Sequence, residues 1–277
     1  MLGYGGGLIS GDAIELNISV KANAKLLITS QSTSKAFKAV SGRDPTFVKT
    51  RAKVSKGGLL VLVPQPMQCF RDSVLTQDTA VTLEGGGGGE GEEDPSLLLV
   101  DWYTGGRENL DGLWQLNSFH TNTSISYSSQ EEDGEECVDS DPSHGHIDKD
   151  GNRSSDPKLV FRDATRLSGG KDLLRHMRDY NIVCCCVLIG PKVEQVSSVF
   201  LKNYSSRHTY DEKESFGPST NMDYNQGEGL NRRDEGLLVS CGTFNTCQEG
   251  NHQEGVVVRL AASTLEIAGT SFSYISL

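Results

Sequence analysis

Three short apolar blocks recur along the chain, and their spacing constrains the fold more than any other feature. The blocks cover residues 26–31 (LLITSQ), 59–65 (LLVLVPQ) and 97–102 (LLLVDW), and their starts lie 33 and 38 residues apart. Short strands that recur at such intervals stack, so that each covers a face of its neighbour. The pattern predicts a mainly β chain of layered, stacked sheets that is β-helix-like. Ordinary sandwich strands at coincidental spacing are the alternative.

Residues 14–20 alternate apolar and polar side chains, which is the period of a half-buried strand. Further predicted strands, all short and rich in apolar or β-branched residues, are 47–54, 80–83, 113–119, 159–162, 182–189, 236–240 and 256–261. About two helices are expected. One covers residues 171–180, with an apolar stripe after Gly169 and Gly170, and one closes the chain from about Ser263, where Glu266 completes a capping box.

Three segments are too polar or too rich in glycine to contribute to a core. They are residues 84–94, 128–158 and 202–235, and composition predicts that they are flexible insertions. We therefore expect one interrupted domain over residues 1–277.

The charge balance bounds the possible partners. The net charge is -11 and the pI is near 5.0, which argues against nucleic acid, because binding to phosphates needs clustered Lys and Arg. A cation or a basic protein face is the better partner. No apolar run approaches the roughly 20 residues that cross a bilayer, so no membrane partner is predicted. Seven cysteines, an odd number with three of them adjacent, favour a reducing compartment, and we expect a cytoplasmic protein.

The sequence lacks the motifs of an enzyme. The glycine-dense segment 4–12 is followed by a strand pattern and by no Lys-Ser/Thr pair, so it is no phosphate loop. No GxSxG or HExxH motif occurs. We therefore predict no enzymatic activity, no catalytic residues and no tightly bound cofactor.

Two groups of metal-ligating residues favour ordinary roles. In a strand, Cys184 and Cys186 share one face while Cys185 points to the other, so the triplet cannot chelate one ion and is predicted to be buried. His144 and His146 lie among aspartates and could hold nickel or zinc adventitiously, but a solvated loop is favoured.

Six blocks in order resemble the UreD/UreH family of urease accessory proteins. They cover residues 5–16, 26–38, 59–73, 97–107, 159–167 and 255–266, and the most specific are TSQSTSK and the Asp-Trp-x-x-x-Gly-Arg motif that ends at Arg107. The resemblance implies a non-enzymatic scaffold of layered, partly helical β architecture. It implies partners of three kinds, a UreF-type accessory protein, a UreG-type GTPase and apo-urease, and a role in loading nickel into urease. It also implies an internal water-filled passage for the ion.

The resemblance also suggests candidate residues. Asp101 and Arg107 are the polar pair expected near the passage, and Asp12 and Asp163 are further candidates for transient contact with Ni(II). A buried Asp101 needs a partner to stay ionised, and Arg107 could supply a bidentate one. The alternative is that Asp101 and Arg107 lock a strand to the following turn. Family members carry residues before the glycine cluster, so we expect either that a first strand is missing here or that the start is misassigned. A missing strand would leave a sheet edge unpaired.

A carbohydrate-binding or inactive β-solenoid protein is the alternative function. It requires clustered exposed aromatic residues and a cleft of paired carboxylates. Aromatic residues make up 7% of the chain and are scattered, so the accessory-protein interpretation is preferred.

Overall fold

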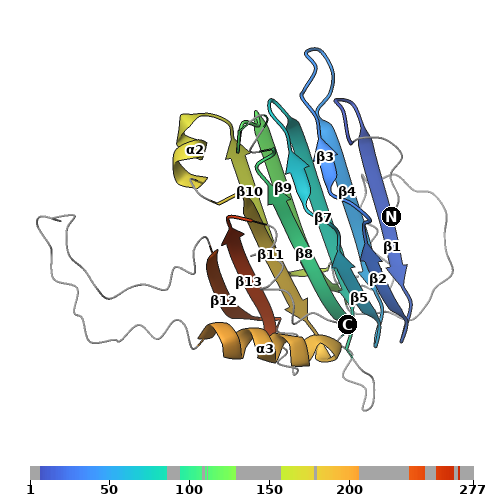
Figure 1. The fold of residues 1–277 in the computed structure, drawn as a ribbon. Coiled ribbons are helices and arrows are strands. Elements are labelled where there is room, and N and C mark those ends of the chain that lie inside the picture. Colours follow the sequence, from blue (N-terminus) through green and yellow to red (C-terminus); the bar gives the residue numbers. More distant parts are fainter. Residues whose placement is uncertain are drawn as a thin grey trace, which may run out of the picture.

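The computed structural model describes residues 7–85, 94–107, 110, 112–128, 157–177, 180–205, 237–246, 254–264 and 268. These residues form two stacked β-sheets (Figure 1). The 5-stranded sheet consists, in spatial order, of β1 (Ala13–Val20), β4 (Thr46–Val54), β7 (Val74–Glu84), β9 (Ser118–Ser128) and β10 (Lys158–Ser168). The 8-stranded sheet consists, in order, of β12 (Leu237–Asn245), β13 (Glu254–Ala262), β11 (Ile182–Ile189), β8 (Ser96–Thr104), β5 (Leu59–Val63) and β2 (Lys25–Thr29), together with β3 (Ser34–Ala36) and β6 (Met67–Cys69).

The first half of the chain alternates between the two sheets. β1, β4, β7 and β9 pair in parallel in one sheet, while β2, β5 and β8 pair in parallel in the other. The three recurrent apolar blocks are β2, β5 and β8, and they are aligned so that Leu26 pairs with Leu60 and Leu60 with Leu97. Their regular spacing therefore reflects stacking of neighbouring strands.

The predicted fold class is confirmed in its main features, a mainly β chain with stacked sheets and two α-helices among the described residues. The finer prediction of a β-helix stays a prediction, because the parallel order ends at β9. From there β10 pairs antiparallel with β9, and β11 pairs antiparallel with both β8 and β13.

Apolar side chains fill three clusters. Two lie between the sheets, one around Leu99 and Ile125 and the other around Tyr103 and Phe119. The third lies on the outer face of the 8-stranded sheet, where helix α3 (Glu194–Ser205) covers it with the fully buried Phe200. Figure 1 shows α3 beside β12 and β13.

The structure corrects some predicted elements. The strand predicted over 113–119 is wrong in its first part. Trp114 has a positive φ of 58° there, and β9 begins only at Ser118 and continues to Ser128. The predicted first helix is confirmed as α2 (Lys171–Met177). By contrast, α3 follows the short 3-10 helix η1 (Pro191–Val193) and was not predicted.

The remaining predictions on organisation lie mostly outside the described residues. These are the closing helix from Ser263 and the three insertions at 84–94, 128–158 and 202–235, although the first residues of the last one belong to α3. Ala268 donates its backbone N–H to the Thr264 carbonyl, which is the helical spacing. Among the described residues, no helix has both the length and the apolar composition of a bilayer-spanning segment.

Candidate functional site

Polar side chains form a band across the space between the two sheets. Residues two apart on a strand face the same side, and two aligned inward rows of the 5-stranded sheet hold Gln77, Thr121 and Thr165, then Thr50, Thr79, Thr123 and Asp163. The 8-stranded sheet faces them with one aligned row of Asp101, Cys185, Arg259 and Ser240. We call these side chains the inter-sheet polar band.

The band separates the two apolar clusters of the interior. Val81 and Ile125 belong to the cluster on one side of it, while Leu75 and Phe119 belong to the cluster on the other. Burying polar groups costs free energy that an all-apolar interior would not incur. A polar layer that interrupts the core is therefore the part of the structure that most needs a functional explanation.

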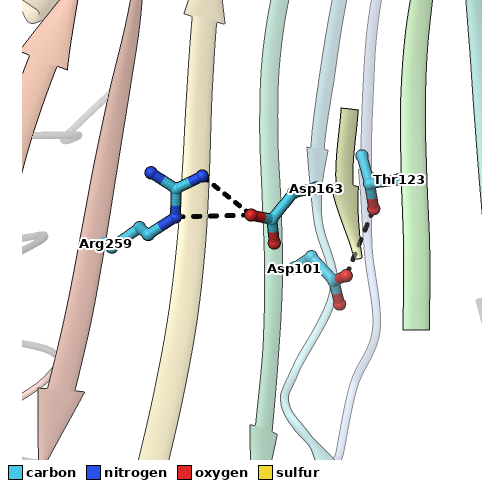
Figure 2. Close-up of polar contacts among 4 residues, drawn as sticks. All are labelled: Asp101, Thr123, Asp163 and Arg259. Atoms are coloured by element: carbon cyan, nitrogen blue, oxygen red, sulfur yellow. Dashed lines mark hydrogen bonds and ion pairs between the residues drawn. The ribbon is translucent and has the colours of Figure 1, made fainter. Parts of the chain in front are cut away.

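Asp101 is the carboxylate at the centre of the band. Its side chain accepts hydrogen bonds from Gln77 Nε2 at 2.8 Å and from Thr121 Oγ1 at 2.8 Å. It also accepts one from Thr123 Oγ1 at 3.2 Å, which Figure 2 shows. Burial raises the pKa of Asp101, and the neighbouring charge of Asp163 adds to that increase, while the bonds from Thr121, Thr123 and Gln77 oppose it. The carboxylate is thus held by neutral donors, and among the described residues no cationic side chain bonds it.

Two cavities meet at Asp101. One of about 300 Å³ is lined by apolar side chains of β1, such as Ile14 and Leu16, and by Gln77 and Thr79. The other, of about 310 Å³, is lined by Thr121, Asp163, Cys185 and Arg259 among others. Asp101 lines both. A small polar species could therefore meet the same carboxylate from either side.

An ion pair lies at the β10 side of the band. Arg259 donates to Asp163 Oδ1 from Nη2 at 2.8 Å and from Nε at 3.3 Å. Figure 2 shows Asp163 between Arg259 and Asp101. The side chain of Asp163 is 21% exposed and that of Arg259 is 50% exposed, so this end of the band reaches solvent.

The cysteine triplet behaves as the strand period predicts. Cys184 and Cys186 belong to the outer apolar cluster under α3, whereas Cys185 faces the inter-sheet space. All three are buried, and burial raises the pKa of the Cys185 thiol to about 12. Among the described residues, no three His, Cys, Asp or Glu side chains are grouped closely enough to hold a metal ion. The His144 and His146 motif lies outside the described residues.

The structure brings together two of the four candidate residues, Asp101 and Asp163. Asp12 lies in the turn before β1, where its Oδ2 accepts the Ile9 backbone N–H at 2.9 Å. Arg107 is exposed, and its guanidinium carbon lies 4.3 Å from the ring centre of Phe70. Instead of the expected contact from Arg107, Asp101 accepts three neutral side-chain donors.

The Asp-Trp-x-x-x-Gly-Arg motif has a local explanation. Gly106 has a φ of 105°, and a Cβ there would lie 2.8 Å from the Cys69 carbonyl oxygen, so only glycine fits this turn. Trp102 donates its indole N–H to the Pro64 carbonyl at 2.6 Å. The motif therefore ties β8 to the chain after β5 and to β6.

Sequence reasoning missed Gln77, Thr121, Thr123 and Arg259. The available signal was the period of two over residues 119–127, where Thr121 and Thr123 occupy the same face as Phe119, Ile125 and Tyr127. Arg259 stands likewise between Val257 and Ala261, in the part of β13 that is otherwise apolar after Glu254.

The fold and the band define a mainly β protein whose interior carries a polar layer between two cavities. The profile of the UreD urease accessory protein family matches residues 1–275. This chain therefore belongs to the UreD urease accessory protein family.

Individual relatives agree with the family match. The chain is similar to "Uncharacterized urease accessory protein ureD-like" of Schizosaccharomyces pombe, with 28% identity over 75% of this chain and 63% of the relative. It is similar to "Urease accessory protein D" of Arabidopsis thaliana, with 23% identity over 95% and 76%. It is also similar to "Urease accessory protein UreD" of Sorangium cellulosum, with 31% identity over 72% and 51%. The matched region thus spans between about half and three quarters of these relatives, and the match supports the accessory-protein prediction over a carbohydrate-binding one.

Proposed function

We propose that this chain is a urease maturation factor that assists nickel insertion into the urease active site and has no turnover of its own. It acts as a scaffold for a UreF-type accessory protein, a UreG-type GTPase and apo-urease. Membership in the UreD family supports the role. The observation that carries the proposal of a nickel passage is that the Asp101 carboxylate lines both inter-sheet cavities.

The chemistry of the band suits a cation in transit. Nickel that is to be passed on needs oxygen ligands and water that bind it weakly, since a closed thiolate site would retain it. The band offers the Asp101 carboxylate, threonine hydroxyls and the Gln77 amide. The thiol of Cys185 is a poor competitor, because its raised pKa keeps it protonated at neutral pH.

The other predicted residues have different parts in this proposal. Asp163 is the carboxylate at the β10 mouth of the passage. Asp12 lines neither cavity, so a nickel contact there would have to occur at the surface before β1. Arg107, exposed over Phe70, is better placed to contact a partner protein than to contact the ion. The buried thiols and the acidic charge are consistent with action in the cytoplasm.

Activation of apo-urease tests the proposal. Reactions would contain nickel, GTP, a UreF-type protein and a UreG-type GTPase, with wild-type chain, Asp101→Asn or no chain. Asp101→Asn keeps the shape of the side chain and removes its charge, so we expect it to lower the yield of active urease on the order of tenfold. Asp78→Asn, on the outer face of β7, is the matched control and should activate as wild type does.

Co-purification tests the scaffold role independently of the nickel passage. Both variants should still co-purify with the UreF-type protein, because neither substitution alters the exposed surface by more than one side chain. A chain that forms no complex at micromolar concentrations would reject the scaffold role. Full activation by Asp101→Asn would reject the passage through the band.

A further inference from the structure

At the β10 side of the band, one sheet extends further than the other. β10 is the last strand of its sheet, whereas the facing sheet continues past β11 with β13 and β12. Arg259 on β13 therefore lies beyond the edge of the 5-stranded sheet and reaches back to Asp163 on β10 (Figure 2). In the described part of the chain, the cavity on this side is lined by two carboxylates, Asp101 and Asp163, and by one cationic side chain, Arg259.

We propose that Arg259 controls the entry of divalent cations at the β10 mouth of the passage, a role that we call a charge gate. Its guanidinium bonds Oδ1 of Asp163 and offsets the carboxylate charge, so a divalent cation engages both oxygens there only by displacing the guanidinium, and the returning guanidinium releases the cation. This inference rests on the proposed function, because it assigns a regulating residue to the same passage.

The contacts of the pair favour a gate. The two guanidinium bonds, from Nη2 and Nε, go to the one oxygen Oδ1, so the pair lacks the two-oxygen fork that makes Arg–carboxylate contacts strong. Half of the Arg259 side chain is exposed, and exposed pairs are screened by water and salt. A guanidinium held in this way can leave the carboxylate without unpacking the core.

The position of the Asp163–Arg259 pair next to Asp101 determines how the gate affects cation binding. Asp163 neighbours Asp101, and the two carboxylates repel each other electrostatically. While Arg259 neutralises Asp163, the remaining carboxylate that an incoming cation meets among the described lining residues is Asp101. When the cation displaces Arg259 it gains a second carboxylate but also stands next to a positive charge, so it is not retained. The mouth can thus admit a divalent ion without becoming a storage site.

A purely structural role is the competing explanation, since the pair also joins one sheet to the other. The two explanations predict opposite patterns. Without Arg259 the mouth carries an unpaired carboxylate, and without Asp163 it carries an unpaired cation. A gate therefore makes the two single variants change nickel affinity in opposite directions, while a structural clamp makes them change in the same direction.

The experiment measures Ni²⁺ binding to the full-length purified chain by equilibrium dialysis. All proteins carry His144→Ala and His146→Ala, so that these histidines contribute no nickel binding. We expect Arg259→Gln to bind Ni²⁺ on the order of tenfold more tightly than the parent and Asp163→Asn on the order of tenfold more weakly. Arg259→Lys keeps the charge and should match the parent, and the double variant Asp163→Asn with Arg259→Gln should lie between the two single variants.

The outcomes distinguish this inference from the proposed function. Thermal unfolding of each variant confirms that it folds, and Arg259→Ala, which also removes the charge, serves as the second test if Arg259→Gln does not fold. If Asp101→Asn abolishes nickel binding while Arg259→Gln leaves it unchanged, the gate is overturned and the passage stands. If Arg259→Gln binds more tightly but Asp101→Asn still activates urease fully, the mouth binds cations and the passage through Asp101 is overturned. Equal weakening in both single variants would assign the pair to structure alone.

Discussion

The two faces of the 8-stranded sheet differ although both carry buried side chains. The outer face is apolar under α3, where Phe200 packs with Val258 and Leu260. The inner face carries the row of Asp101, Cys185 and Arg259 across the same strands. One sheet therefore stabilises the fold with one side and presents polar chemistry with the other. The comparison predicts that substitutions on the two faces affect different properties.

Phe200→Ala should give the largest loss of stability. The side chain is 1% exposed in the outer apolar cluster, so its truncation should lower the free energy of unfolding by about 3–5 kcal/mol. Urea denaturation followed by circular dichroism measures this. Val199→Ala, the exposed neighbour on α3, is the control. A loss below about 1 kcal/mol for Phe200→Ala would show that α3 does not stabilise this face.

Thiol reactivity probes burial on both faces at once. Burial raises the pKa of Cys69 and of Cys185 to about 12 and that of Cys184 well above the usual range. At pH 8 we expect alkylation by iodoacetamide to be about 100-fold slower or more in the native protein than in urea. Peptide mass spectrometry reports each site separately. Cys241, which is only partly buried, should react faster than these three; labelling of Cys185 at the same rate in both states would contradict the structure.

Asp101 should make stability depend on pH. Its folded-state pKa is raised above the ordinary 3.8, so the ionised carboxylate destabilises the fold, and this cost grows as the pH rises from about 3.8 and levels off above the folded-state pKa. Asp101→Asn stays neutral. The difference in unfolding free energy between Asp101→Asn and wild type should therefore shift in favour of the variant as the pH rises from 4 to 8. Urea titrations across this range measure it, and a difference that is independent of pH would contradict the assignment.

The smallest effect is expected on the solvent side of the 5-stranded sheet. Arg51 pairs with Glu15 there, and both side chains are 52% exposed. Exposed pairs contribute little, so Arg51→Ala should change the free energy of unfolding by less than about 1 kcal/mol. The same urea titration measures it, and Arg51→Lys is the matched control. A loss comparable to that of Phe200→Ala would mean that this face is not simply solvated.

Much of the fold follows from local patterns in the sequence. The alternation that begins at Ile14 and the apolar run at Ile182–Ile189 predict β1 and β11 closely, because burial on one or both faces decides those residue types. β9 was predicted only at its start, although Thr121 and Thr123 continue the alternation of Phe119, Ile125 and Tyr127, and their burial is explained by the hydroxyl bonds that Asp101 accepts. α3 was missed because Ser197 and Ser198 interrupt its apolar stripe.

The site was harder to predict than the fold. Asp101 and Asp163 were chosen through the family resemblance, and the sequence places them 62 residues apart. Arg259 reaches Asp163 only because β13 lies beside β11 in the facing sheet, a pairing that no local pattern encodes. The partners of a buried charge are set by tertiary topology, which explains why Arg107, near in sequence, was expected where Gln77 and two threonines stand.

The alignment of the polar rows across neighbouring strands limits how the gene can change. Deleting Leu75, near the start of β7, while Val74 keeps its place would turn Gln77 and Thr79 toward solvent and send Thr76 and Asp78 into the interior, since side chains alternate between the two sides of a strand. Changes in chain length are therefore tolerated between strands and strongly disfavoured within them. Insertions can therefore accumulate in the loops between the strands, whereas the number of residues within each strand is constrained.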